Sequence, residues 1–168
     1  MPGAEGHADG CRIGSAPGIA LQPGIGAQVG EPVRRDAADR GGFWLVEQYR
    51  YTVGGRFWEF PQGTFPHGQD GDPAELARSE LAEETGLRAG HLEHLARLHI
   101  AYGMSSQGCN VFLATSLEHG PARRECEEQD MCQQWVARSS FEQMIGDGAI
   151  TDTATIATYA LLRVREAN

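Results

Sequence analysis

The stretch ELAEETGL, residues 80–87, decides the fold and the chemistry that this sequence predicts. In a helix of about 3.6 residues per turn, Glu80, Glu83 and Glu84 lie on one face, with neighbouring Cβ atoms about 5–6 Å apart. Their mutual repulsion and their position towards the negative end of the helix dipole oppose this arrangement. Two interpretations fit: a solvated acidic face, or a site where carboxylate oxygens bind a divalent cation such as Mg²⁺ or Mn²⁺.

The residues around this stretch predict a helix over 73–85. Asp72 is a typical N-cap, Pro73 suits the first helical position, and Gly86 ends the helix. Apolar residues recur on the other side of the helix at Ala74, Ala77 and Leu81. The acidic face therefore lies at the margin of a buried stripe.

The rest of the chain predicts strands followed by helices. An aromatic run, FWLVEQYRYTV (43–53), and RFWEF (56–60) flank Gly54-Gly55 and predict a hairpin. Further strands are expected over 95–102, 110–117 and 131–138, with helices capped by Ser139 (to about 145) and Asp152 (to about 166). This order predicts a mixed α/β or α+β domain in which helices cover a sheet.

The first thirty residues differ in composition from the rest. They hold eight of the 22 glycines and three of the eight prolines, and no aromatic residue occurs before Phe43. Such a segment buries too little apolar surface to offset its ordering entropy. We therefore expect residues 1–30 to be disordered and residues 31–168 to form one domain.

The charge composition excludes several function classes. Fourteen basic and 23 acidic side chains give a formal charge of −9, which argues against nucleic-acid and polybasic membrane partners. All the basic residues are arginines, so a P-loop lysine and Schiff-base chemistry are excluded. The four cysteines form no CxxC pair, and no apolar run is long enough to cross a bilayer. We expect a cytoplasmic protein.

The sequence around the helix resembles the Nudix hydrolase family. The signature of that family is G-x5-E-x7-R-E-U-x-E-E-x-G-U, where U is a bulky apolar residue, and ELAEETGL matches its second half; WEFPQG (58–63) also fits. The first half departs from the signature. Gln69 stands at its glutamate position, the spacer that follows is two residues longer, and Ser79 stands at its arginine position.

This resemblance implies a Nudix-type α/β/α sandwich with a mixed sheet and a bound Mg²⁺ or Mn²⁺. The implied metal ligands are Glu80, Glu83, Glu84 and the main-chain carbonyl of Gln62, and Glu84 is also expected to be catalytic. The signature arginine normally orients the loop and the first glutamate, and Ser79 cannot do so in the same way. The implied general base is a glutamate of the acidic loop RRECEEQD (123–130), with Glu127 as the first choice and Glu128 as the second; a solvated loop is the plain alternative.

Two further motifs resemble the branch that cleaves ADP-ribose and other nucleoside-diphosphate sugars. They are VEQYRY (46–51) and AITDTATIATYALL (149–162). Arg50, Trp58 and Glu59 are then the expected substrate-binding residues, the alternatives being an exposed strand arginine, a buried sheet aromatic and an outward strand residue. The implied reaction is hydrolysis of a small-molecule nucleoside diphosphate derivative, with ADP-ribose giving AMP and ribose 5-phosphate. The alternatives are a non-catalytic module that senses ADP-ribose and a Nudix hydrolase acting on other nucleotides.

The sequence leaves one edge of the expected sheet unexplained. Nudix proteins normally begin with an apolar strand before the one at Phe43, but residues 29–42 show no such alternation. Three arrangements stay open: a shortened sheet, pairing with a second subunit in a homodimer, or a different kind of N-terminal region.

Overall fold

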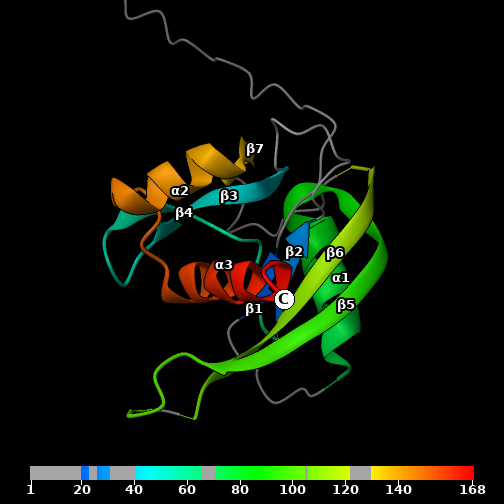
Figure 1. Ribbon diagram of the computed structural model, residues 1–168, viewed down its shortest axis with the longest axis horizontal. Coiled ribbons are helices and arrows are strands. Elements are labelled where there is room, and N and C mark those ends of the chain that lie inside the picture. The colour runs from blue at the N-terminus through cyan, green and yellow to red at the C-terminus, as the bar shows by residue number, and fades with distance from the viewer. Residues whose placement is uncertain (1–19, 23–25, 31–40, 66–70, 105, 122–129) are drawn as a thin grey trace, which may run out of the picture.

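Two β-sheets form the framework of the computed structural model, which describes residues 20–22, 26–30, 41–65, 71–104, 106–121 and 130–168 (Figure 1). The first sheet is mixed and has the order β1 (Ala20–Gln22), β2 (Gly26–Gly30), β6 (Gly108–His119), β5 (Leu87–His99). The second is antiparallel and has the order β4 (Gly55–Glu59), β3 (Gly42–Arg50), β7 (Cys132–Ala137).

Helices pack on both sides of this framework. α1 (Pro73–Thr85) packs against the four-stranded sheet, α2 (Arg138–Gly146) packs against β3 and β7, and α3 (Thr153–Glu166) runs between the two sheets (Figure 1). The predicted α/β/α sandwich with a mixed sheet is confirmed. Within the described ranges, no helix is both long and apolar enough to cross a membrane.

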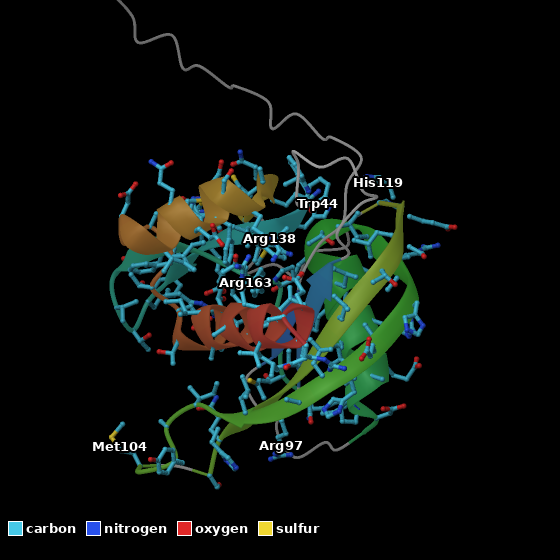
Figure 2. The ribbon with its side chains drawn as sticks, viewed as in Figure 1. Trp44, Arg97, Met104, His119, Arg138 and Arg163 are labelled. Carbon is cyan, nitrogen blue, oxygen red and sulfur yellow. The ribbon has the colours of Figure 1, made fainter. Side chains whose placement is uncertain are left out.

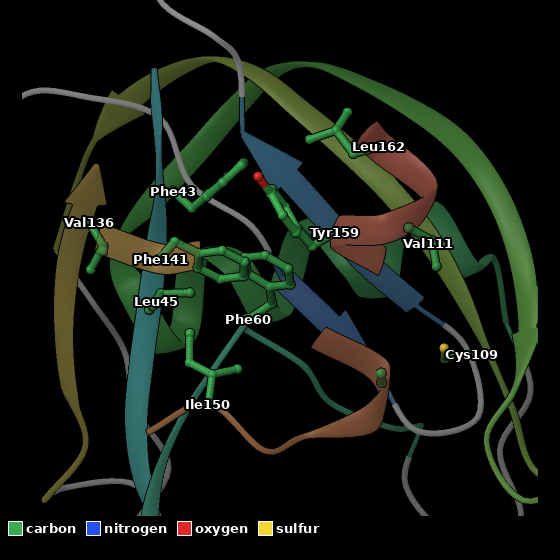
Figure 3. Close-up of a cluster of buried hydrophobic side chains, with 11 residues drawn as sticks. Phe43, Leu45, Phe60, Cys109, Val111, Val136, Phe141, Ile150, Tyr159 and Leu162 are labelled. Carbon is green, nitrogen blue, oxygen red and sulfur yellow. The ribbon is translucent and has the colours of Figure 1, made fainter. Parts of the chain in front are cut away.

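An aromatic cluster joins the second sheet to α2 and α3 (Figure 3). The ring of Phe43 on β3 makes edge contacts with Phe60, Phe141 and Tyr159 at centroid distances of 5.8, 5.0 and 5.6 Å. Phe60 stacks on Phe141 at 5.3 Å. Such pairs each add about 0.5–1.5 kcal/mol beyond area burial, so Phe60 is anchored firmly at the point where β4 ends.

Arg138 connects the beginning of α2 to the end of α3 (Figure 2). Its two terminal nitrogens donate to the Glu166 carboxylate at 2.5 and 2.6 Å, and its guanidinium lies 5.3 Å from the Phe43 ring centroid. This bidentate pair keeps both helices against the aromatic cluster.

The sequence signals at the ends of α1 are confirmed. The Asp72 carboxylate accepts a hydrogen bond from the Ala74 N–H at 2.9 Å, and Pro73 begins the helix. Gly86 follows the last turn with a φ of 71°, a conformation that favours glycine. A second, smaller core packs Leu81 of this helix against Trp44.

Several element boundaries differ from the prediction. β5 begins at Leu87 rather than at 95, because the first half of this long strand is partly exposed and a bulge between His94 and Ala96 breaks its alternation. α2 begins at Arg138, and Ser139 lies inside it, so the predicted Ser139 cap is wrong; the N-cap residue, Ala137, makes no side-chain cap hydrogen bond. The 43–60 hairpin is confirmed, with Gly54 at a φ of 66° in its turn.

The structure describes two strands in the N-terminal segment. β1 and β2 lie within residues 1–30, where the composition predicts disorder, and the other residues of that segment lie outside the described ranges. β2 pairs in parallel with β6, with Ala27 opposite Val111, and β1 pairs antiparallel with β2. The first sheet is thus extended by strands of the same chain.

Candidate active site

Glu84 is the most constrained acidic residue of α1. Its side chain is fully buried, and its Oε2 accepts a hydrogen bond from the Gln62 main-chain N–H at 3.0 Å. A solvated acidic face therefore does not describe this residue. The bond joins the last turn of α1 to the segment that follows β4.

Glu80 lies against the same segment. A Cβ placed on Gly63 would be 2.0 Å from the Glu80 carboxylate, so only glycine leaves room for that carboxylate. Two of the three glutamates of the acidic face therefore contact consecutive residues of one loop, Gln62 and Gly63. The motif PQG supplies both the glycine and the N–H donor.

Glu83 has a different partner. Its Oε1 accepts a hydrogen bond from the Ser79 hydroxyl at 2.5 Å, one turn earlier on α1. Arg78 points away from the site and donates to the Ala89 main-chain carbonyl at 2.8 Å. Ser79, which stands at the signature arginine position, thus forms a hydrogen bond with Glu83. Gln69 lies outside the described residues.

The donor chemistry of this face fits a divalent cation. Carboxylate oxygens one turn apart are hard ligands of the kind that Mg²⁺ and Mn²⁺ prefer. Across the described ranges, however, no three His, Cys, Asp or Glu side chains are grouped closely enough to hold a metal. Glu80 and Glu84 already lie at the loop. For Glu83 to join them as a third ligand, its side chain would have to leave Ser79 and adopt another rotamer.

A cavity of about 420 Å³ lies next to the loop. Gln62 lines it, so the residue whose N–H binds Glu84 also forms part of the cavity wall. The other polar lining residues include Arg50, Glu59, Gln107 and Asp152, and the apolar ones include Val53, Phe57 and Ile100. This mixed lining suits a small ligand with both polar and apolar parts.

Glu59 is the buried charged group of the cavity. Arg50 forms an ion pair with it, and the Gln48 side-chain amide donates to its Oε1 at 2.6 Å. Burial raises the pKa of Glu59 above its ordinary value, and the nearby Asp152 adds to the rise, whereas Arg50 acts in the opposite direction. Arg50 itself is partly exposed, and both side chains line the cavity.

The cavity contains one thiol, from Cys109. Burial raises the pKa of this thiol to about 11. It is therefore protonated at neutral pH and unsuited to act as a nucleophile.

The remaining predicted site residues are Trp58, Glu127 and Glu128. Trp58 precedes Glu59 on β4, so its side chain points to the opposite face, where it packs against the aromatic cluster; it is not among the described residues that line the cavity. Glu127 and Glu128 lie outside the described residues.

The structure adds site residues that the sequence reasoning missed. Gln48 lies on the same face of β3 as Arg50, and a period of two along the strand could have identified it. Asp152 is an expected helix cap that also lines the cavity. Thr155 accepts a hydrogen bond from the Phe60 N–H, and no sequence motif pointed to this long-range contact.

The amino-acid sequence of this chain is similar to a known domain family and to characterised proteins. The NUDIX domain family model matches residues 31–155. An ADP-ribose pyrophosphatase of Mycobacterium tuberculosis (strain ATCC 25618 / H37Rv) is 37% identical over 121 residues, which are 71% of this chain and 58% of that protein. An ADP-ribose pyrophosphatase of Bacillus subtilis (strain 168) is 26% identical over 130 residues, 77% of this chain and 69% of that protein. This chain thus spans less than two thirds of the length of the mycobacterial relative.

A solved structure shares the fold. The crystal structure of an ADP compounds hydrolase superposes with a TM-score of 0.66 at 19% identity, covering 86% of this chain and 71% of that one. At this level of identity the likeness concerns the fold alone.

Proposed function

The chain belongs to the NUDIX domain family, and on this premise we propose that it hydrolyses ADP-ribose to AMP and ribose 5-phosphate. The substrate is proposed because two relatives are ADP-ribose pyrophosphatases. A cavity that combines charged and apolar lining next to the acidic helix supports the same substrate class.

One observation carries the proposal: Glu84 is a fully buried carboxylate near the C-terminal end of a helix, hydrogen-bonded to the Gln62 N–H. Burial and the helix dipole both disfavour an anion there. The Gln62 N–H offsets part of that cost. A cation bound beside Glu84 and Glu80 would stabilise the carboxylate further.

The proposed cation is Mg²⁺ or Mn²⁺, since hydrolases of this family generally use divalent metal ions. Its ligands would be Glu80, Glu83, Glu84 and the carbonyl of Gln62. When bound, it would supply Lewis-acid neutralisation of the pyrophosphate charge.

The protein's own groups would bind the substrate and move the proton. Arg50 and Glu59 would hold the phosphate and hydroxyl groups in the cavity. Trp58, which packs away from the cavity, would act on substrate only indirectly. Glu127, or in second place Glu128, would accept the proton of the attacking water. The water oxygen bonds to one phosphorus and the bridging P–O bond breaks, which yields the two monophosphates.

The test is product formation from ADP-ribose with and without Mg²⁺, alongside a panel of nucleoside triphosphates, dinucleoside polyphosphates and sugar nucleotides. We expect metal-dependent AMP release that is strongest with ADP-ribose. Faster turnover of another member of the panel would contradict the substrate and retain the reaction. Tight ADP-ribose binding in isothermal titration calorimetry without any product would instead identify a sensing module.

A further inference from the structure

The first turn of α3 holds the site loop through a hydrogen bond to its backbone. The Thr155 hydroxyl accepts a hydrogen bond from the Phe60 main-chain N–H at 3.1 Å and donates to the Asp152 Oδ2 at 2.7 Å. The Thr155 main-chain N–H donates to the same oxygen at 2.8 Å. Thr155 is fully buried, and its one hydroxyl proton is directed to Asp152, so its oxygen is oriented to accept from Phe60.

The same short segment is also bound by α1. Two residues after Phe60, the Gln62 N–H donates to Glu84. The backbone of residues 60–62 is thus fixed between Thr155 on α3 and Glu84 on α1. This backbone also carries the Gln62 carbonyl and leads directly to Gly63, which borders the Glu80 carboxylate.

We propose that Thr155 is a positioning residue for the cation-binding face: by holding the Phe60 N–H, it sets the backbone that orients the Glu84 carboxylate. This inference rests on the proposed function, in which Glu84 binds a divalent cation. The Phe60 ring is already anchored by Phe43 and Phe141, so burying that ring does not require the hydroxyl. The hydroxyl controls the direction of the backbone that leaves β4.

The test compares Thr155→Val with Thr158→Val. Valine has the shape of threonine without the hydroxyl, and the hydrogen bond from the residue 155 main-chain N–H to Asp152 is retained. Thr158 is equally buried one turn later on α3, and among the described residues its hydroxyl has no hydrogen-bond partner, so it is a matched control. Both variants are assayed for Mn²⁺ binding by electron paramagnetic resonance without nucleotide, and for ADP-ribose hydrolysis over a range of Mg²⁺ concentrations.

We expect Thr155→Val to bind Mn²⁺ about tenfold more weakly than the unmodified protein, with a matching rise in the Mg²⁺ concentration for half-maximal hydrolysis. The KM for ADP-ribose at saturating Mg²⁺ should stay unchanged, because the cavity wall keeps its side chains. Thr158→Val should match the unmodified protein in Mn²⁺ affinity, and Thr155→Ser should restore most of it. Should Thr155→Val not fold, Thr155→Cys replaces it, since a thiol is only a weak acceptor.

Unchanged Mn²⁺ affinity in the Thr155 variant, or an equal loss in Thr158→Val, would overturn the inference. If the unmodified protein binds Mn²⁺ through Glu84 but releases no product, the proposed function fails, while the Mn²⁺ comparison still decides the role of Thr155. If Mn²⁺ binding is absent, or insensitive to Glu84→Gln, both are overturned.

Discussion

Glu84 differs from its two neighbours on the acidic face in how little freedom it has. Glu83 is partly exposed and accepts a hydrogen bond from Ser79 of its own helix. Glu80 has a flexible side chain, and its carboxylate contacts Gly63. Glu84 is enclosed on all sides and fixed by a main-chain donor from another element. A carboxylate held in this way is suited to bind a cation without losing further conformational freedom.

Replacing Glu84 by glutamine tests this role. Glutamine keeps an oxygen that can accept the Gln62 N–H but loses the negative charge, so the fold should persist. We expect the hydrolysis rate to fall by about two to three orders of magnitude, as when one charge-stabilising group is removed from an active site. The measurement is ADP-ribose turnover at saturating Mg²⁺ together with thermal unfolding. Glu75→Gln, at an exposed position on the same helix, is the control, and near-normal turnover in Glu84→Gln would remove the case for the metal site.

Glu59 gives a prediction about pH. Its pKa in the folded protein is raised above the ordinary value of 4.5, chiefly by burial, so the folded state binds the proton more tightly than the unfolded state. Its contribution to stability is therefore fully present below the unfolded pKa and is lost as the pH rises through the folded pKa. Glu59→Gln cannot ionise. We expect the free energy of unfolding of the variant, relative to the unmodified protein, to increase from about pH 4.5 upward.

Denaturant titrations of both proteins over this pH range measure that difference. A difference that stays flat across the range would show that the Arg50 ion pair offsets the burial of Glu59.

The site residues that could be predicted from the sequence are those placed by the periodicity of a helix or a strand. One helical face brought Glu80 and Glu84 to the same loop, and strand alternation places Arg50 and Glu59 together. The same alternation separates Trp58 from Glu59, because adjacent strand residues point to opposite faces. The contact from Thr155 to Phe60 could not be predicted, since it depends on how α3 packs on the end of β4.

At the scale of elements, the contact between the loop after β4 and α1 depends on the absence of a side chain at Gly63. The backbone there does not have a positive φ, so alanine is compatible with its conformation. The added Cβ would, however, displace the Glu80 carboxylate, which is the far end of a flexible side chain. The collision should therefore affect the site and leave the fold intact.

Gly63→Ala is expected to lower ADP-ribose turnover about 100-fold, because small misplacements of a reacting group have effects of that size. Its free energy of unfolding should stay within about 0.5 kcal/mol of the unmodified value. Steady-state kinetics and chemical denaturation measure the two quantities. Gly103→Ala, which meets no atom within 4 Å, is the control. Full activity in Gly63→Ala would mean that Glu80 does not need its present position.

Helices whose ends carry a side-chain cap or a terminal glycine were predicted with correct bounds. Elements that lack such signals were not. The Asp72 cap and Gly86 set both ends of α1, and Asp152 sets the beginning of α3. α2 begins without a side-chain cap hydrogen bond, so the sequence suggested Ser139 instead. The first half of β5 is partly exposed and becomes a strand by pairing with β6, which is a tertiary effect that local propensity does not report.

At the scale of the whole molecule, the N-terminal strands protect the edge of β6. Without them, the main-chain groups along one side of β6 would lack partners, and such an edge favours association between molecules. The composition of residues 1–30 predicts disorder because it contains so little to bury, yet the parallel pairing of β2 depends on the main chain of β6.

Deleting residues 1–30 should therefore destabilise the protein by about 1 kcal/mol for each main-chain hydrogen bond lost. It should also cause concentration-dependent association, measured by light scattering. Deleting only residues 1–19 removes no described strand and is the control. Unchanged stability and mass after the longer deletion would support the disorder that the composition predicts. The same light-scattering measurement on the full chain tests the homodimer.

The parallel pairing of β2 with β6 also has a consequence during synthesis. Ala27 pairs with Val111, which lies more than eighty positions later in the chain. At about 5–20 residues per second, a nascent strand β2 waits on the order of ten seconds before its partner leaves the ribosome. The segment GAQVG is short and poor in large apolar side chains. It can therefore stay hydrated during that interval without aggregating or pairing with another strand.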